Sequence, residues 1–147
     1  MGDIKGIDEK IRELLIDAVD DNLEEVQDFV NVSLGQLTDN MKLEMTMSIA
    51  VEEIFINVSH YAYDYKGGDL IVRTHLLDDP RGIKVEFEDK GPYFDPLKKP
   101  DPDVTLDVEQ RQIGGLGIFM VKKSMDECSY ERVDDKNVFS MVKFIPE

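Results

Sequence analysis

Two polar side chains four residues apart, Glu53 and Asn57, form the first pair in this sequence whose types and spacing could do chemistry. At about 100° per residue they share one face of a helix. An asparagine supplies a neutral oxygen ligand to Mg²⁺, and a glutamate can orient a water molecule or accept a proton. The pair therefore predicts a metal–phosphate site, and an ordinary solvated helix pair is the alternative.

A second candidate is the sequence Asp89-Lys90-Gly91, at the end of a segment with alternating apolar and polar residues. An aspartate there can accept a hydrogen bond from the amine of an adenine, and a glycine lets the base approach the backbone. The same residue types also favour a simple turn at the end of a strand.

The third candidate is the group Gly114, Gly115 and Gly117, which precedes a predicted helical run at residues 118–125. Closely spaced glycines at a helix start expose backbone N–H groups to which an anion can bind. A flexible loop ending is the alternative. Residues 91–113 hold four of the six prolines in the chain and predict a lid over a ligand.

Short apolar or alternating segments predict the strands that must position these groups. An apolar run at residues 14–16 predicts a first strand, and residues 70–77 and 83–88 predict a hairpin with one dry and one wet face. Residues 128–133 and 138–145 predict two further strands, separated by a turn at residues 134–137.

Two helices are expected between the first and second strands. Asp21 and Glu24 resemble a capping box at the start of one helix. The other helix is expected to begin near Asp39 or Asn40 and to run to about Tyr63. The core-facing stripe of this second helix is expected to contain Met47, Val51, Ile54 and Val58.

The order strand, two helices, two strands, long loop, helix, two strands predicts a single α+β domain over residues 1–147. We expect a two-layer sandwich with a mixed, mostly antiparallel sheet and helices on one face.

Composition limits the possible partners and compartment. There are 17 Lys and Arg residues against 32 Asp and Glu residues, for a net charge of −15. This balance argues against binding to nucleic acid or to an anionic membrane, and it leaves open either a solvated surface or an acidic face for a basic protein partner. A single cysteine, Cys128, excludes an internal disulfide and favours a reducing compartment. No signal region or membrane-spanning run is evident, so a cytoplasmic location is expected.

Taken in order, these motifs resemble those of the GHKL superfamily, the histidine-kinase-like ATPases. Residues 50–63 resemble its N box, residues 87–96 the box with a D-x-G motif, residues 114–118 the glycine-rich box and residues 137–143 the final strand. The D-x-G-x-x-F-D-P extension and the G-G-L-G-I-F run are most similar to the stand-alone branch of anti-sigma regulatory factors with serine/threonine protein kinase activity.

The resemblance implies a role for each matching residue, with ATP and Mg²⁺ as the ligands. Asn57 would coordinate Mg²⁺, Glu53 would act as general base, and Asp89 would hold the adenine amine with Gly91 beside the ring. Arg111, just before the glycines, would touch the terminal phosphate. The glycines expected to contact the phosphates are Gly114, Gly115 and Gly117.

Two positions depart from the family pattern. Members of this branch often carry histidine four residues after the N-box asparagine, but that position here is Tyr61, so the neighbouring His60 is expected to be structural or exposed. The family also commonly uses a late-strand threonine against adenine. Ser140 is the nearest hydroxyl here, although Phe139 could occupy that register.

The resemblance predicts a serine/threonine protein kinase that phosphorylates a STAS-type antagonist and also binds a sigma factor. The alternative is an ATP-binding partner-switch module without phosphotransfer. The ATPase half of a histidine kinase would need its phospho-accepting histidine from another chain, and a structural adaptor would leave the glycines and the lid unexplained. Because members of this family often form dimers, the resemblance also implies a homodimer, with the first strand and helix as the candidate interface.

Overall fold

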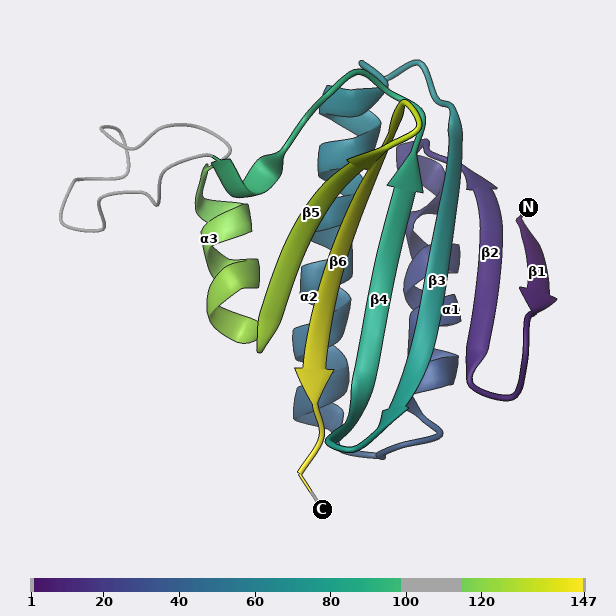
Figure 1. Cartoon of the computed structure of the whole chain (residues 1–147), viewed down its shortest axis with the longest axis vertical. Helices are drawn as coiled ribbons and strands as arrows, with labels where there is room; N and C mark the ends of the chain where they lie inside the picture. The colour runs from purple at the N-terminus through teal and green to yellow at the C-terminus, as the bar shows by residue number, and fades with distance from the viewer. Residues whose placement is uncertain (1, 99–114, 147) are drawn as a thin grey trace, which may run out of the picture.

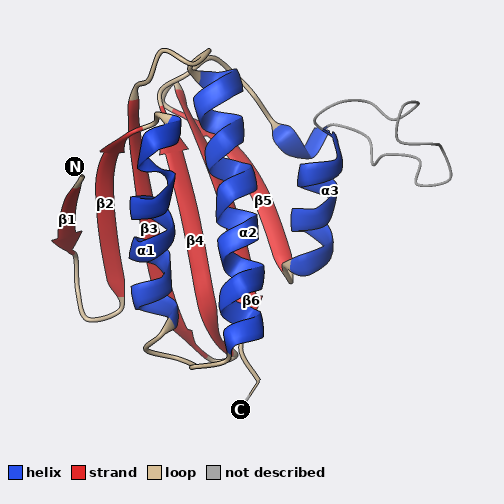
Figure 2. Ribbon diagram, turned by 180° about the vertical axis from the view of Figure 1, so that it is seen from behind, coloured by secondary structure: helices blue, strands red, loops and turns tan. Residues whose placement is uncertain are grey.

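The computed structural model describes residues 2–98 and 115–146, which form a six-stranded sheet with three α-helices packed on one face (Figures 1 and 2). The strand order is β1-β2-β3-β4-β6-β5, and every described pair is antiparallel. The strands are β1 (Asp3–Gly6), β2 (Ile11–Asp17), β3 (Asp69–Asp78), β4 (Arg81–Asp89), β5 (Glu127–Val133) and β6 (Lys136–Phe144). The helices are α1 (Leu23–Leu34), α2 (Met41–Asn57) and α3 (Gly115–Ser124). The α+β sandwich is thus confirmed, with an antiparallel rather than a mixed sheet in the described part.

The hydrophobic core lies between the sheet and the helices. On β4, Ile83, Val85 and Phe87 point to the helical side and are at most 1% exposed, whereas the residues between them are polar. This period of two places the last residue of the strand, Asp89, on the same inner side. The predicted dry and wet faces of the sheet are confirmed.

The helix termini are only partly as expected. The side chain of Asn40 caps α2 by accepting hydrogen bonds from the backbone N–H groups of Lys42 (2.9 Å) and Leu43 (3.1 Å). The prediction of a capping box at Asp21 is wrong, because a 3-10 turn, η1 (Asp20–Asn22), occupies that position and no side chain caps α1. The α-helical part of α2 ends at Asn57, and the π-helical turn η2 (Val58–Ala62) continues it.

Two parts of the sheet differ from the sequence expectation. Strand β1 lies at one edge, and its four residues are all exposed, so it lacks the apolar pattern that would have predicted it. The turn before β6 contains only Asp134 and Asp135, whose φ angles are +49° and +63°, so β6 already begins at Lys136. None of the helices in residues 2–98 and 115–146 is long and apolar enough to cross a membrane.

Candidate functional site

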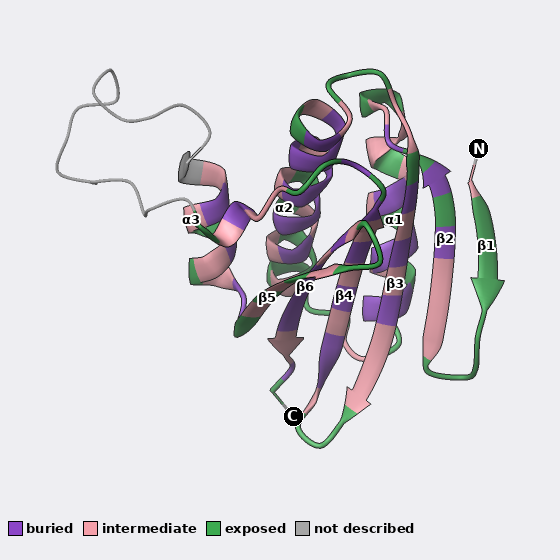
Figure 3. Cartoon of the chain, turned by 45° about the horizontal axis from the view of Figure 1, so that its top comes forward, coloured by how far each residue is buried: buried purple, intermediate pink, exposed green. Residues whose placement is uncertain are grey.

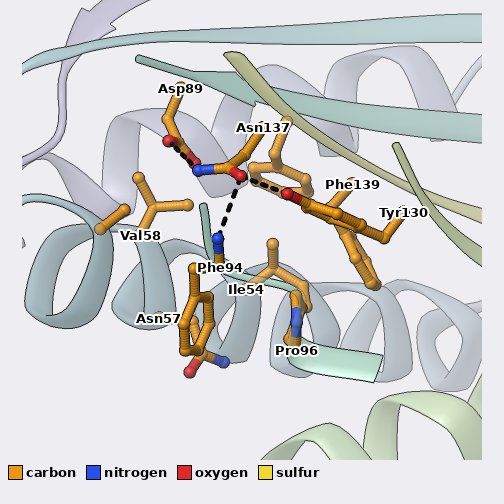
Figure 4. A pocket seen from close by; sticks show the side chains of 11 residues that line it. Ile54, Asn57, Val58, Asp89, Phe94, Pro96, Tyr130, Asn137 and Phe139 are labelled. Atoms are coloured by element: carbon orange, nitrogen blue, oxygen red, sulfur yellow. Dashed lines mark hydrogen bonds between the residues drawn. The ribbon is translucent and has the colours of Figure 1, made fainter. Parts of the chain in front are cut away.

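A cavity lies between the C-terminal half of α2 and the ends of β4, β5 and β6 (Figure 4). Its walls are mostly apolar, and its polar groups come from different elements. Ligand sites commonly combine an apolar wall with a few placed polar groups. The apolar wall includes Ile54, Val58, Ala62, Phe87 and Phe139, and the polar groups are Asn57, Asp89, Tyr130 and Asn137.

Asp89 is the buried carboxylate of this cavity and is only 4% exposed. Its Oδ1 accepts hydrogen bonds from the Gly91 N–H (2.9 Å) and from Asn137 Nδ2 (2.8 Å). No hydrogen bond among the described residues uses Oδ2, which keeps access to the cavity. Burial raises the pKa of Asp89, and the two hydrogen bonds oppose that increase. Asp89 can therefore accept one further donor from a ligand.

Asn137 holds Asp89 in place and was not anticipated from the sequence. It is 3% exposed, and its Oδ1 accepts hydrogen bonds from the Tyr130 hydroxyl (2.5 Å) and from Arg132 Nη1 (3.2 Å). Arg132 Nη1 also donates to the carbonyl oxygen of Gly91 (2.8 Å). Figure 4 shows Asn137 between Asp89 and Tyr130. The network thus joins β4, β5, β6 and the loop after β4.

The loop after β4 is also held from the side of η2. The hydroxyl of Tyr63 accepts a hydrogen bond from the Lys90 N–H (2.6 Å) and donates to the carbonyl oxygen of Asp69 (2.6 Å). A Cβ atom at Gly91 would lie 2.6 Å from the backbone oxygen of Ala62, closer than real Cβ atoms come. A glycine is therefore required at position 91 by close backbone packing.

Asn57 and Glu53 occupy the α2 side, as their spacing predicted. Asn57 is 8% exposed and its Nδ2 donates to the backbone oxygen of Glu53 (2.8 Å). No hydrogen bond of the described residues uses Asn57 Oδ1, which is left as a neutral ligand oxygen. Burial, with a smaller contribution from the Glu52 charge, raises the pKa of Glu53 and makes it a stronger base than an ordinary exposed glutamate.

Helix α3 approaches α2 at Glu53. A Cβ atom at Gly117 would collide with the Glu53 carboxylate and would lie 2.7 Å from its Cδ. Because α3 begins at Gly115, Gly115 and Gly117 lie in its first turn, where backbone N–H groups lack intrahelical partners and favour anions. Gly114 and Arg111, also predicted to meet the phosphates, lie outside the described residues.

Two other residues singled out from the sequence, Ser140 and His60, lie elsewhere. Ser140 does not line the cavity: it faces the other side of the sheet, and Phe139 takes the expected register. Ser140 therefore does not supply the hydroxyl group that was predicted to contact adenine. His60 Nε2 contacts Asp20 Oδ2 (2.9 Å) and its ring stacks on Tyr65 at 4.1 Å, which is a structural role.

The donor set fits a purine nucleotide with a hard cation. The open space inside the cavity is about 20 Å³, room for a water molecule only. A base can therefore enter only if lining side chains move, and two of them, Phe94 and Pro96, belong to the segment after the D-x-G motif. No group of three or more His, Cys, Asp or Glu ligands occurs in residues 2–98 and 115–146. Such a site suits Mg²⁺, which keeps several waters and binds substrate phosphates besides one or two protein oxygens.

The helix-covered antiparallel sheet and this cavity define a nucleotide-binding α+β sandwich. The family model for the histidine kinase-like ATPase domain matches residues 16–143, and the chain belongs to this family. ATP binding is implied by this membership.

Three curated relatives indicate which branch of this family the chain is similar to. The chain is similar to serine-protein kinase RsbW of Listeria innocua, with 30% identity over 106 residues that cover 69% of this chain and 66% of that protein. It is 30% identical to the anti-sigma F factor of Caldanaerobacter subterraneus over 112 residues, which cover 76% and 77% of the two chains. A third relative, serine/threonine-protein kinase BtrW of Bordetella bronchiseptica, is 24% identical over 96 residues that cover 65% of this chain and 67% of that protein. The matched part spans about two thirds of the length of the two kinases.

Proposed function

We propose that this chain is a Mg²⁺- and ATP-dependent protein kinase that phosphorylates a serine or threonine of a partner protein. The observation that carries the proposal is the placement of two groups around one cavity: the buried Asp89, with one oxygen unused, and Asn57 on the opposite wall, one helical turn from Glu53. The first group suits an adenine amine, and the second suits a cation with phosphates.

Each residue then has one task. Asp89 Oδ2 accepts a hydrogen bond from the exocyclic amine of adenine, and Gly91 leaves room beside the ring. Asn57 Oδ1 is the protein ligand that would hold Mg²⁺, which neutralises phosphate charge when bound. The N–H groups of Gly115 and Gly117 are available to the phosphate oxygens.

Glu53 completes the transfer as the general base. It accepts the proton of the partner's hydroxyl while that oxygen forms a bond to the terminal phosphorus and the bond to the leaving ADP breaks. The raised pKa of Glu53 supports this role, because a stronger base takes the proton more readily.

The partners are inferred from the relatives. Their names, serine-protein kinase and anti-sigma F factor, support a protein serine as the phosphate acceptor and a sigma factor as a second partner. The resemblance to the anti-sigma branch suggests a STAS-type antagonist as the phosphorylated protein. In this scheme the chain binds one or the other according to the antagonist's phosphorylation. Binding without transfer is the alternative function.

The test compares Glu53→Gln with Glu52→Gln, a matched change at the exposed neighbouring position of α2. With candidate STAS-domain proteins of the same organism and radiolabelled Mg-ATP, Glu53→Gln should lose about 100-fold or more in phosphoserine formation and keep its ATP affinity. Glu52→Gln should retain both. ATP binding without phosphoserine in the unmodified protein would select the partner-switch alternative, and no ATP binding would refute both.

A further inference from the structure

Helix α2 exposes a row of large apolar side chains on its outer face. Met41, Met45 and Ile49 recur every four residues and are 81%, 67% and 55% exposed. This spacing places them one above the other on one helical face. We refer to these three residues as the methionine stripe. On α1, which lies beside α2 in Figure 2, Val32 adds a fourth exposed apolar side chain at 58%.

The fold does not need this row of apolar side chains. The opposite face of α2 supplies the core, where Met47, Val51 and Ile54 are at most 2% exposed. Between α1 and α2, Asn31 Nδ2 donates to Ser48 Oγ (3.1 Å). The exposure of the stripe shows that α1 does not cover it. In Figure 3, α2 carries buried, intermediate and exposed positions along its length. An exposed contiguous apolar row on a soluble domain is typical of an interaction surface.

The charges on α2, which carries the stripe, and on α1 beside it are mostly negative. Helix α1 contains three acidic residues and no basic residue. Helix α2 contains three glutamates and one lysine, Lys42. Two of the glutamates, Glu44 and Glu52, are exposed on α2 near the stripe. The two helices together therefore carry a net charge of −5.

We propose that the methionine stripe is a docking surface for a cationic amphipathic helix of a protein partner. The apolar face of such a helix would cover Met41, Met45 and Ile49, and its basic residues would meet the carboxylates of α1 and α2. Methionine suits this use, because its flexible thioether adapts to different partner side chains. Binding of a second copy of this chain, or of an anionic membrane, would bring negative charges together. Electrostatic repulsion therefore disfavours both of these occupants.

This surface is independent of the proposed kinase chemistry. The stripe occupies the N-terminal half of α2 and its outer face, whereas Asn57 lies at the C-terminal end of the helix in the cavity wall. An experiment can therefore refute the docking proposal while it supports nucleotide binding, or refute nucleotide binding while it supports docking.

The test uses a fluorescent synthetic peptide of about 18 residues, five helical turns, made of Leu and Lys with all Leu on one face. A scrambled peptide of the same composition controls for simple attraction to an acidic protein. Fluorescence anisotropy with the full chain measures affinity. The variant is Met45→Gln/Ile49→Gln, and its matched control is Ile4→Gln/Ile7→Gln, which changes two exposed apolar residues, 58% and 49% exposed, away from α2.

The amphipathic peptide should bind at least about tenfold more tightly than the scrambled one. Met45→Gln/Ile49→Gln should weaken binding about tenfold, and Ile4→Gln/Ile7→Gln should change it less than about twofold. Glu44→Gln/Glu52→Gln should weaken it a few-fold and reduce its salt dependence. Unchanged melting temperature and ATP affinity in all variants would show that they fold.

Equal affinity for the two peptides, or no effect of the stripe variant, would overturn the proposal. So would a self-associated protein that Met45→Gln/Ile49→Gln converts to monomers in sedimentation equilibrium, because the stripe would then hold a second copy. Stripe-dependent binding to vesicles with anionic lipids would equally overturn it in favour of a membrane surface.

Discussion

The two walls of the cavity are built very differently. At the Asp89 wall, the carboxylate is held by Gly91 and Asn137, and Asn137 is held in turn by Tyr130 and Arg132. The second wall is formed by α2, and we call it the Glu53 wall although Asn57, not Glu53, lines the cavity there. One hydrogen bond orients Asn57, and the Glu53 carboxylate contacts the first turn of α3 at Gly117.

Under the proposed function, this difference assigns recognition to the Asp89 wall and catalysis to the Glu53 wall. A buried network of hydrogen bonds is rigid. It presents one unused acceptor, Asp89 Oδ2, to a ligand in a fixed direction. A site with few internal hydrogen bonds leaves oxygen atoms available to bind a cation. The cation can then bind the phosphates of the ligand. We therefore expect changes at the Asp89 wall to act on binding and folding together, and changes at the Glu53 wall to act mainly on transfer.

The largest effect is expected for Asp89→Asn. An asparagine can keep the two donors at Oδ1, but it presents an NH₂ group where the adenine amine needs an acceptor. ATP affinity should fall about 10- to 150-fold in calorimetric titration, the range for a hydrogen bond to a charged group. The same change removes a buried charge, so the melting temperature of the free protein should rise.

The control for this change is Asp69→Asn, which removes an exposed ion pair with Lys90 at 3.5 Å and should affect neither property. Equal ATP affinity in Asp89→Asn and the unmodified protein would remove Asp89 from the nucleotide site.

The next effect is expected for Asn137→Ala. It removes one donor to Asp89 and the shared acceptor of Tyr130 and Arg132. Urea unfolding should show a loss of about 2 kcal/mol in the free energy of unfolding, and ATP affinity should also fall. Asn31→Ala, which removes the half-buried bond to Ser48, should cost about 1 kcal/mol or less and leave ATP binding intact. Equal losses in the two variants would contradict the special role of Asn137.

A smaller and more selective effect is expected for Gly117→Ala. The added methyl group displaces the Glu53 carboxylate, which can swing aside because it ends a flexible side chain. Phosphotransfer should fall about tenfold while stability changes by less than about 1 kcal/mol. Gly6→Ala is the matched control, because nothing lies within 4 Å of a Cβ there. Full transfer activity in Gly117→Ala would separate Glu53 from the chemistry.

The smallest effect concerns pH. The pKa of Asp89 is raised above the unfolded value of 3.8, so the native state binds a proton more readily than the unfolded state. The stability of the free protein should therefore fall as pH rises from 3.8 through the raised pKa, and Asp89→Asn should lack this slope. ATP affinity should change in the opposite sense, because the adenine amine needs the ionised carboxylate. Thermal unfolding and titration at successive pH values measure the two slopes, and an identical stability slope in Asp89→Asn would contradict the assignment.

Much of the Glu53 wall was predictable from the sequence, and the reason is local geometry. The four-residue spacing of Glu53 and Asn57 on a helix fixes their relative position without knowledge of the rest of the fold. Asp89 was predictable for the same reason, since alternation along β4 places it on the inner side of the sheet.

Asn137 and Ser140 show what the sequence could not provide. Their side of the sheet depends on where β6 begins, and a shift of one residue reverses every side chain of a strand. The turn was expected to include Asn137, but the left-handed residues Asp134 and Asp135 complete it. Asn137 and Phe139 therefore face the cavity and Ser140 faces away. The Asp-Asp pair was the available signal, because two-residue hairpin turns require positive φ.

The most direct test of the two-wall account is calorimetric titration with ATP, with and without Mg²⁺, of the unmodified protein, Asp89→Asn and Asn57→Ala. The unmodified protein should bind ATP weakly without Mg²⁺ and more tightly with it. Asn57→Ala should keep the weak binding and lose the gain from Mg²⁺, whereas Asp89→Asn should lose binding in both conditions. ATP binding that is equal in all three proteins, or that Mg²⁺ improves equally in Asn57→Ala, would contradict the account.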